Sequence, residues 1–489
     1  MQTTYVTAAA ILVVVSWGAP RIAAESQPAG RIPIVYSTDL LHPHDDPDDH
    51  YDLATLFALP EFELRGIVLD LGERQRTRIG RPPVAQMIEI TGRSVPSAVG
   101  LDRPLRNPTD TAADVPAEFQ GGVDLLLAAL RNSTDPVVLF TAGSCRDVAA
   151  AFNRQPQLLK EKVRALYVNA GNGPQGPQWE HNVRLDEDAY FRLFEAGLPL
   201  YWCPCWSDEP GQPQAILGQK AYATYYVADQ AEVVGACTPA VRNFFVYCLT
   251  RAETDPIAFL KSNPQPLPTG PHNMWCTAVL FHAAGREIYR RGPDDFVALP
   301  PEEANRQGLQ DRKVTPYQFV PVRAVREETF TDERKTPNSS GPAAVYVEQS
   351  GDRVGNRQAE PDGKRDCCVR LSGLPRDKTI RNVVLTGPRQ GRWELQETER
   401  WWRVFLEPGG EATDCRFSFY ATGPHRIELQ FEDGGTVALE FAVSRPPATG
   451  LESQLESADP NARLFHVTDE RYPEILASAL KNLLAGLGR

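Results

Sequence analysis

The chain has 489 residues, of which 42% are hydrophobic, and a formal net charge of −12. This length exceeds one typical domain, so we expect two or three domains with buried cores. The acidic balance, without any stripe of Lys and Arg, excludes a nucleic-acid partner. The nine cysteines form no Cys-x-x-Cys pair, which argues against a zinc ribbon.

The first 24 residues are typical of a secretory signal. An apolar run covers residues 8–17, and Ala23 and Ala24 form a cleavage signal before Glu25. The run is too short to anchor the chain in a bilayer, and no other stretch is typical of a membrane span. We therefore expect export to the periplasm or the extracellular space; the alternative is a disordered cytosolic leader.

Residues 30–295 alternate between strand-like and helix-like segments. Amphipathic stretches at residues 123–130, 147–152 and 187–196 separate apolar runs that are typical of buried parallel strands. The expected strands are Ile32–Tyr36, Leu64–Leu69, Val95–Val99, Val137–Thr141, Val163–Val168 and Leu198–Trp202. This alternation predicts a doubly wound α/β domain with a mostly parallel sheet.

The pattern changes after residue 295. Residues 296–342 are rich in Pro, Glu and Arg, which favours a linker or a draped connection. Short β-like runs fill residues 343–445, with a hairpin signal at Asp433–Gly435, and predict a β-sandwich. Residues 446–489 form a tail, with an amphipathic helix expected over Tyr472–Leu487. Six aromatic residues of the sandwich could stack on a sugar or simply fill its core: Trp393, Trp401, Trp402, Phe417, Phe419 and Tyr420.

The segment Thr38–Asp52 carries six aspartates and three histidines directly after the first expected strand. So many carboxylates repel one another unless a cation neutralises them, and in open α/β sheets ligands bind at the carboxyl ends of strands. The alternative is an acidic surface loop or a cluster that complements a helix dipole, although a helix cap needs only one or two carboxylates. The six are Asp39, Asp45, Asp46, Asp48, Asp49 and Asp52.

Four segments in order resemble the nucleoside hydrolase family, of the inosine-uridine-preferring type. They are IPIVYSTD with DDHYDLATLFALPEFELRGI, then VVLFTAGSCRDVAAAF, then VRALYVNAGN, then WEHNVRLDEDAYFRLFEAGLPL, and they cover residues 32–202. The resemblance implies a calcium-dependent hydrolase of the N-glycosidic bond of ribonucleosides or a related glycoside. In this family an aspartate takes a proton from a metal-activated water.

The resemblance also implies the metal ligands. Asp39 matches the first aspartate of the family's metal motif and Asp52 the last, with Asp49 between them in a segment that is longer than usual. Asp39 or Asp49 would be the general base, and Ala142 falls where the family donates a backbone carbonyl to the ion. Calcium, which takes six to eight oxygen ligands, is the implied cofactor, and another divalent metal stays open.

The substrate-binding residues follow from the WEHN segment. Glu180 and Asn182 match the family's Glu-Phe-Asn, whose acid and amide hold sugar hydroxyls. Asn169, Asn172 and Asp48 are further candidates for the same pocket. Three tryptophans could stack on a base or belong to the core: Trp179, Trp202 and Trp275.

One departure from the family concerns its C-terminal His-Asp pair, which opens a helix. The corresponding helix is expected at MWCTAVLFHAAGREIY, which puts Met274 and Trp275 at the pair; His272 and Asn273 could substitute only with a two-residue shift. The change removes one hard ligand and a candidate acid.

Three functions therefore stay open. The first is the hydrolase, and the second is a nucleoside- or sugar-binding protein that keeps the fold without turnover. The third is a transition-metal hydrolase that uses His42, His44 or His50 as nitrogen ligands. The expected partner is a small nucleoside or sugar, and a homo-oligomer stays open.

Overall fold

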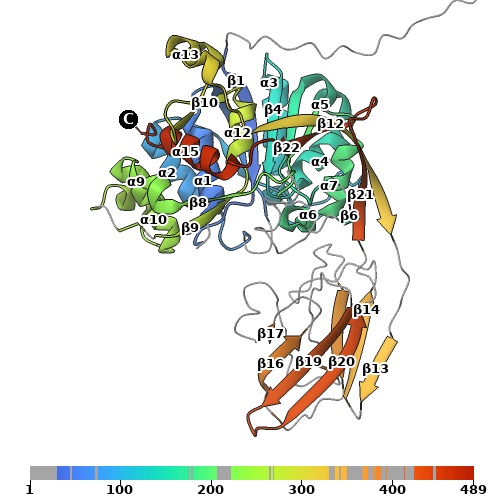
Figure 1. Ribbon diagram of the computed structural model, residues 1–489. Helices are drawn as coiled ribbons and strands as arrows, with labels where there is room; N and C mark the ends of the chain where they lie inside the picture. The colour runs from blue at the N-terminus through green and yellow to red at the C-terminus, as the bar shows by residue number, and fades with distance from the viewer. Residues whose placement is uncertain are drawn as a thin grey trace, which may run out of the picture. The chain divides into compact units, whose positions relative to one another are not determined.

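The structure is a computed structural model of the whole chain (Figure 1), which divides into two units at residues 1–30 and 31–489. The expected signal peptide, residues 1–24, lies outside the described residues. The residues that the structure describes are 30–44, 47–71, 75–174, 176–177, 180–205, 222–263, 266–267, 269–329, 336–340, 343–349, 367–372, 378, 380–386, 392–393, 412–413, 423–443 and 448–488.

A ten-stranded, mostly parallel sheet organises the α/β domain, which confirms that part of the predicted fold. The strand order is β3-β2-β1-β4-β5-β7-β22-β12-β21-β6, and the first seven strands are mutually parallel. The six expected strands are present as β1 (Ile32–Thr38), β2 (Phe62–Leu69), β3 (Ser97–Val99), β4 (Val137–Ala142), β5 (Val163–Val168) and β7 (Leu200–Trp202). The antiparallel part consists of β12 (Tyr317–Thr329), β21 (Ala448–Leu455) and β6 (Gly176–Pro177), next to the parallel β22 (Ala462–Val467).

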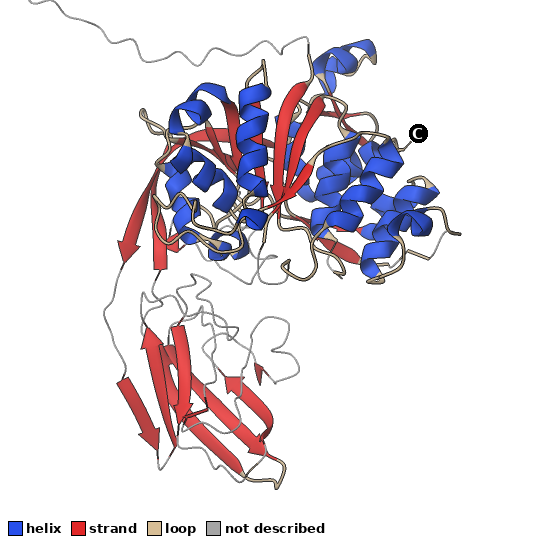
Figure 2. Ribbon diagram, turned by 180° about the vertical axis from the view of Figure 1, so that it is seen from behind, coloured by secondary structure: helices blue, strands red, loops and turns tan. Residues whose placement is uncertain are grey.

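Helices cover both faces of this sheet (Figure 2). Alternate side chains of β1 enter two separate hydrophobic clusters, Ile34 and Tyr36 on one face and Val35 on the other. The first cluster is covered by α1 (Asp48–Ala58), α2 (Arg81–Thr91), α10 (Pro239–Leu249), α12 (Thr277–Ala283) and α15 (Tyr472–Leu484). The second is covered by α3 (Gly121–Asn132), α4 (Arg146–Arg154), α5 (Pro156–Lys162) and α7 (Glu187–Phe194). Because both faces are buried, the strands are continuous apolar runs rather than alternating ones.

The remaining elements of the α/β domain are short. They are α6 (His181–Leu185), α9 (Gln230–Gly235), α11 (Pro256–Leu260), α13 (Pro301–Arg306), the 3-10 helices at Ala117–Phe119 and Gln310–Arg312, and the hairpins β8 (Tyr226–Asp229) with β9 (Pro271–Met274) and β10 (Glu287–Arg290) with β11 (Phe296–Leu299). Within the described residues, no helix is both long and apolar enough to cross a membrane.

Two segments differ from the sequence-based expectation because distant strands pair with them. Residues 296–329 hold β11, α13 and β12 where a linker or draped connection was expected, and β12 pairs with β22 along Tyr317–Val322. The tail likewise supplies β21 and β22 to the main sheet before α15, which lies where the C-terminal helix was predicted. Local composition predicts neither of these strand pairings.

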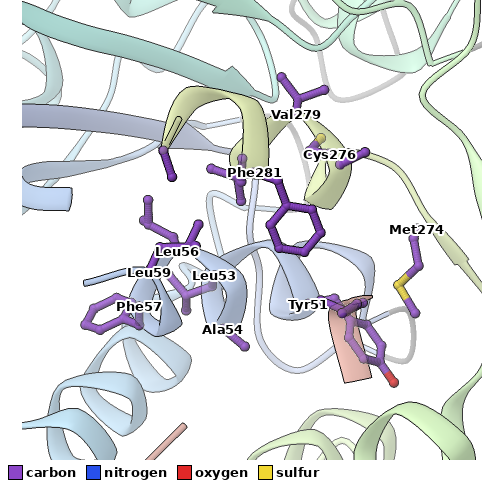
Figure 3. Packing of buried hydrophobic residues seen from close by; sticks show 14 of the residues in the cluster. Tyr51, Leu53, Ala54, Leu56, Phe57, Leu59, Met274, Cys276, Val279 and Phe281 are labelled. Atoms are coloured by element: carbon purple, nitrogen blue, oxygen red, sulfur yellow. The ribbon is translucent and has the colours of Figure 1, made fainter. Parts of the chain in front are cut away.

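The expected helix at residues 274–289 begins later and ends earlier than predicted. Met274 pairs with Tyr226 in the β8–β9 hairpin, so the backbone is extended up to that point, and Cys276 is the N-cap of α12. Met274 is fully buried in the first cluster, beside the packed side chains of α1 and α12 (Figure 3). Met274 and Trp275 therefore both precede α12, whose first residue is Thr277.

Two small antiparallel sheets hold the described strands between residues 336 and 443. One has the order β13 (Thr336–Ser340), β14 (Ala343–Gln349), β15 (Cys367–Ser372), β18 (Ala412–Thr413); the other β17 (Arg392–Trp393), β16 (Ile380–Thr386), β19 (Gly423–Phe431), β20 (Thr436–Val443). The predicted hairpin at Asp433–Gly435 joins β19 to β20, and Gly434 has the positive φ of 84° that its turn needs. Trp393 lies in β17, and the other five aromatic candidates lie outside the described residues.

Candidate functional site

The site candidates gather at the carboxyl edge of the sheet, where the chain crosses over between β1 and β4. The strand order reverses at this point, which in open α/β sheets creates a crevice for ligands. Asp39 follows β1, and its backbone N–H donates to the carbonyl of Ala142, the last residue of β4, at 3.3 Å. Gln75 Nε2 donates to the Asp39 carbonyl at 2.6 Å. The backbone of Asp39 is thus held from two sides.

The close approach of the two strand ends depends on Gly143. A Cβ atom added there would stand 2.7 Å from the backbone nitrogen of Asp39. The Ala142 carbonyl, expected as a metal ligand, uses one lone pair on the Asp39 N–H, which leaves the other for an ion or water.

The first turns of α1 bring further carboxylates to the same edge. Thr38 Oγ1 donates to Asp49 Oδ1 at 2.9 Å, which ties the helix start to the end of β1. Asp48 and Asp49 in the first turn also complement the helix dipole, as the alternative reading requires. Asp52 is one turn further and only 2% exposed, so the helix dipole does not account for it. Asp45 and Asp46 lie outside the described residues.

Burial and mutual repulsion dominate the electrostatics of these carboxylates. Burial raises the pKa of Asp52 to about 7, although hydrogen bonds from the thiol and the N–H of Cys276 pull it down. Burial also raises the pKa of Asp49, and the neighbouring Asp39, Asp48 and Asp52 raise it further. These carboxylates are close enough to oppose one another's ionisation, which a bound cation would reverse.

The donor set fits a hard cation in its chemistry. Oδ1 of Asp52 is buried without a hydrogen-bond partner among the described residues, and an orphaned buried carboxylate oxygen is costly. As they stand, no three Asp, Glu, His or Cys side chains in the described part of the chain converge closely enough to hold an ion. The carboxylates would therefore have to draw together around it.

The expected sugar-binding residues form the other half of the site, at the end of β5. Glu180 caps α6: its carboxylate accepts from the N–H groups of Asn182 at 2.9 Å, Gly171 at 2.9 Å and Val183 at 3.4 Å. Asn182 Nδ2 donates to the Asn169 carbonyl at 2.9 Å. Glu180, Asn182 and Asn169 are thus brought together, with Glu180 oriented by three amides.

Asn169 offers the clearest open acceptor in this half. Its Nδ2 donates to the Thr141 carbonyl at 2.8 Å, and its Oδ1 is buried with no hydrogen-bond partner among the described residues. Asn172, the further candidate, is 1% exposed.

His181 connects the two halves, and sequence reasoning missed it. Its Nε2 lies 3.5 Å from Asp39 Oδ2, and its side chain is 70% exposed. The available signal was its place in WEHN, where the family's triplet has Phe.

Other candidates lie away from this edge or in the core. His42 Nε2 donates to the Ala252 carbonyl at 2.6 Å, and its ring stacks on Tyr247. The His50 ring is buried against Phe244. This packing on α10 gives the transition-metal reading no support.

The structure describes two of the three candidate tryptophans. Trp202 is fully buried and donates to the Ala170 carbonyl at 3.2 Å, so it belongs to the core. Trp275 precedes Cys276 and packs on Tyr225 at 4.6 Å between ring centroids. Trp179 lies outside the described residues.

Residues 35–254 match the family described as inosine-uridine preferring nucleoside hydrolase. Pyrimidine-specific ribonucleoside hydrolase RihA of Enterobacter sp. (strain 638) is 26% identical over 187 residues, which cover 35% of this chain and 58% of that protein. RihA of Citrobacter koseri is 26% identical over 188 residues, with the same coverage. The chain thus spans 58% of the length of these curated relatives.

Solved structures give a more distant likeness. A purine-preferring ribonucleoside hydrolase from Gardnerella vaginalis has 17% identity and a TM-score of 0.33, over 46% of this chain and 78% of the other.

Proposed function

This chain is a divergent member of the nucleoside hydrolase family, and on that premise we propose that it hydrolyses the N-glycosidic bond of ribonucleosides or a related glycoside. One observation carries the proposal: the carboxylate of Asp39, after β1, lies near α6, which carries the side chains that we propose to bind the sugar. The contact between His181 and Asp39 measures that proximity. A small nucleoside or sugar is the partner that such an edge fits.

The chemistry needs a water on one face of the sugar and support for its hydroxyls. Cleavage passes through an oxocarbenium-like state, in which a base must remove a proton from the attacking water. Asp39 is the proposed base, because its backbone is fixed at the switch point and its side chain is 12% exposed. Asp49, whose carboxylate already accepts a hydrogen bond from Thr38, is the second candidate.

The side chains at the end of β5 are proposed to orient the sugar. Among the described residues Asn169 Oδ1 has no hydrogen-bond partner, so it can accept from a hydroxyl, and Asn182 is hydrogen-bonded to the Asn169 backbone. Glu180 is buried and held by three amides, so we propose that it contributes a fixed negative charge and at most one remaining lone pair to a hydroxyl. Asp48, in the first turn of α1, remains a candidate on the opposite side.

The proposed cofactor is calcium, held by Asp39, Asp49 and Asp52 with the Ala142 carbonyl. When bound, the ion supplies positive charge that neutralises the carboxylates and acidifies a water. The orphaned Oδ1 of Asp52 supports this assignment.

The test is release of free base from a panel of ribonucleosides, measured by chromatography with calcium present. Asp39→Asn should lower kcat by about 100-fold or more, because it removes the base while keeping the shape of the side chain. Asp114→Asn is the matched control: Asp114 is an exposed carboxylate paired with Arg103, and its loss should change nothing. Full activity of the Asp39→Asn variant would contradict the assignment of the base.

A binding protein without turnover is the second candidate, and one observation favours it. The residue that opens α12 is Cys276, so a thiol rather than a carboxylate faces Asp52. This candidate predicts saturable nucleoside binding in calorimetry together with no release of base from any member of the panel.

The remaining expectations are proposals about the rest of the chain. We propose that the two small antiparallel sheets pack as a β-sandwich; their strand pairings support this. We also propose export after cleavage near Ala24. Sequencing the N-terminus of protein recovered from the periplasm or medium tests the second proposal, since retention of residues 1–24 would contradict it.

A further inference from the structure

A buried arginine binds together several loops at the edge of the sheet that carries the site. Arg146 begins α4, directly after β4, and is 2% exposed. Its Nη1 donates to the carbonyls of Leu71 at 2.8 Å and Leu101 at 3.1 Å. Its Nη2 donates to the Leu185 carbonyl at 2.8 Å, and its Nε to Asp186 Oδ2 at 3.3 Å. A guanidinium group offers five N–H donors in a rigid fork, and these four hydrogen bonds use four of them.

The segments that Arg146 contacts come from different parts of the chain. Leu71 follows β2, Leu101 follows β3, and Leu185 and Asp186 join α6 to α7. Arg146 itself follows β4, so one side chain links the carboxyl-end loops of three strands of the sheet to α6. Burying an unpaired arginine would cost several kcal/mol, so such a site persists only when its donors are satisfied.

Two routes connect this arginine to the proposed catalytic groups. The first runs through α6, which ends at Leu185 and begins next to Glu180, the capping carboxylate. Asp186 strengthens the anchor, because its carboxylate also accepts from the N–H groups of Leu105 at 2.8 Å and Ala189 at 3.0 Å.

The second route runs through Asp70. Its Oδ1 lies 4.0 Å from Arg146 Nη1, and its Oδ2 accepts from the Ser144 N–H at 2.8 Å. The Asp70 N–H donates to the Thr38 carbonyl at 2.9 Å, one residue before Asp39. Arg146 therefore reaches both halves of the site without contacting the crevice residues themselves.

We propose that Arg146 is a positioning residue that fixes α6, with Glu180 and Asn182, at a set distance from Asp39. The inference rests on the proposed function for its kinetic consequence, but the mechanical link stands on its own contacts. A displacement of about 1 Å between reacting groups can cost about 100-fold in rate. Lysine cannot replace this arginine, since a single ammonium has three donors on one atom and cannot reach carbonyls on separate loops.

The experiment compares Arg146→Met and Arg146→Lys with Arg93→Met. Arg93 is a matched control: its guanidinium donates to the carbonyls of Phe57 at 2.6 Å, Leu59 at 3.0 Å and Phe62 at 2.6 Å, near the start of β2 at the opposite edge of the sheet. Two readouts are taken well below the unfolding temperature: amide hydrogen exchange by mass spectrometry, and kcat and KM for the best ribonucleoside.

Both Arg146 variants should speed exchange by about tenfold in residues 180–186, and lower kcat/KM by about 10- to 100-fold with a raised KM. Arg93→Met should leave exchange in residues 180–186 and both kinetic constants unchanged, even if it lowers the unfolding temperature. Unchanged exchange in residues 180–186 in the Arg146 variants overturns the proposal. So does an equal effect of Arg93→Met, or faster exchange with wild-type kinetics. If the wild-type protein releases no base at all, the proposed function fails, while the exchange data still decide whether Arg146 holds α6.

Discussion

Acid should destabilise the fold through His282, which lies near the end of α12. Tyr167 Oη and His282 Nδ1 form a hydrogen bond of 2.8 Å, and Phe319 packs on the ring with 4.5 Å between ring centroids. Burial lowers the pKa of His282 from its ordinary value of 6.5 to about 4; the charge of Glu287 opposes this shift and that of Arg463 adds to it. The folded protein therefore keeps this imidazole neutral at pH values where the unfolded chain protonates it.

The magnitude follows from linkage. The unfolded chain binds a proton below about pH 6.5 and the folded chain only below about pH 4, so the free energy of unfolding falls as pH drops through this window and then levels off. A pKa difference of about 2.5 at about 1.36 kcal/mol per unit gives a full loss of about 3 kcal/mol, of which about 2 kcal/mol is lost by pH 5.

The assay is urea unfolding of the α/β domain at pH 7 and pH 5, followed by tryptophan fluorescence. His282→Gln keeps an acceptor for Tyr167 but cannot titrate, so its loss of stability between the two pH values should be about 2 kcal/mol smaller than that of the wild type. Equal losses in the two proteins would refute the reasoning, because other titrating groups contribute the same amount to both.

Two further predictions concern the edge of the sheet. Gly143→Ala places a Cβ 2.7 Å from the Asp39 nitrogen, so it should lower the free energy of unfolding in urea by about 1–3 kcal/mol and remove most of the base-releasing activity. Gly235→Ala is the control: a Cβ there meets nothing within 4 Å, so both quantities should stay unchanged. An equal effect of the two changes would contradict the prediction. Calcium at about 100 times its Kd should add about 2.7 kcal/mol to the free energy of unfolding, measured by calorimetry with and without chelator. Asp52→Asn should lose most of this gain while Asp114→Asn keeps it, and a wild-type protein indifferent to calcium would rule out the proposed cofactor.

Local sequence was sufficient for the six expected parallel strands and for the acidic segment after the first of them. Runs such as Ile32–Tyr36 and Val137–Thr141 predicted strands that are present, because a strand buried on both faces must be apolar throughout. The carboxylates of Thr38–Asp52 could be found as well, because a cluster of charges next to an apolar run is a local property of the sequence.

Tertiary structure decided what depends on partners far along the chain. Residues 317–329 carry no local mark of joining the main sheet, and they join it because β21 and β22, whose paired residues lie 119 to 150 positions away, supply hydrogen bonds. The start of α12 at Thr277, later than the sequence predicted, likewise depends on the pairing of Met274 with Tyr226.

The sequence by itself thus indicated the resemblance to nucleoside hydrolases, the α/β class and the acidic loop, since these depend on residue types and their order. The tertiary structure alone revealed the contact of His181 with Asp39 and the role of Arg146 in joining loops after β2, β3 and β4 to α6. The physical reason is that the role of a buried polar side chain depends on the groups with which it forms hydrogen bonds. Those groups are neighbours only in the folded chain.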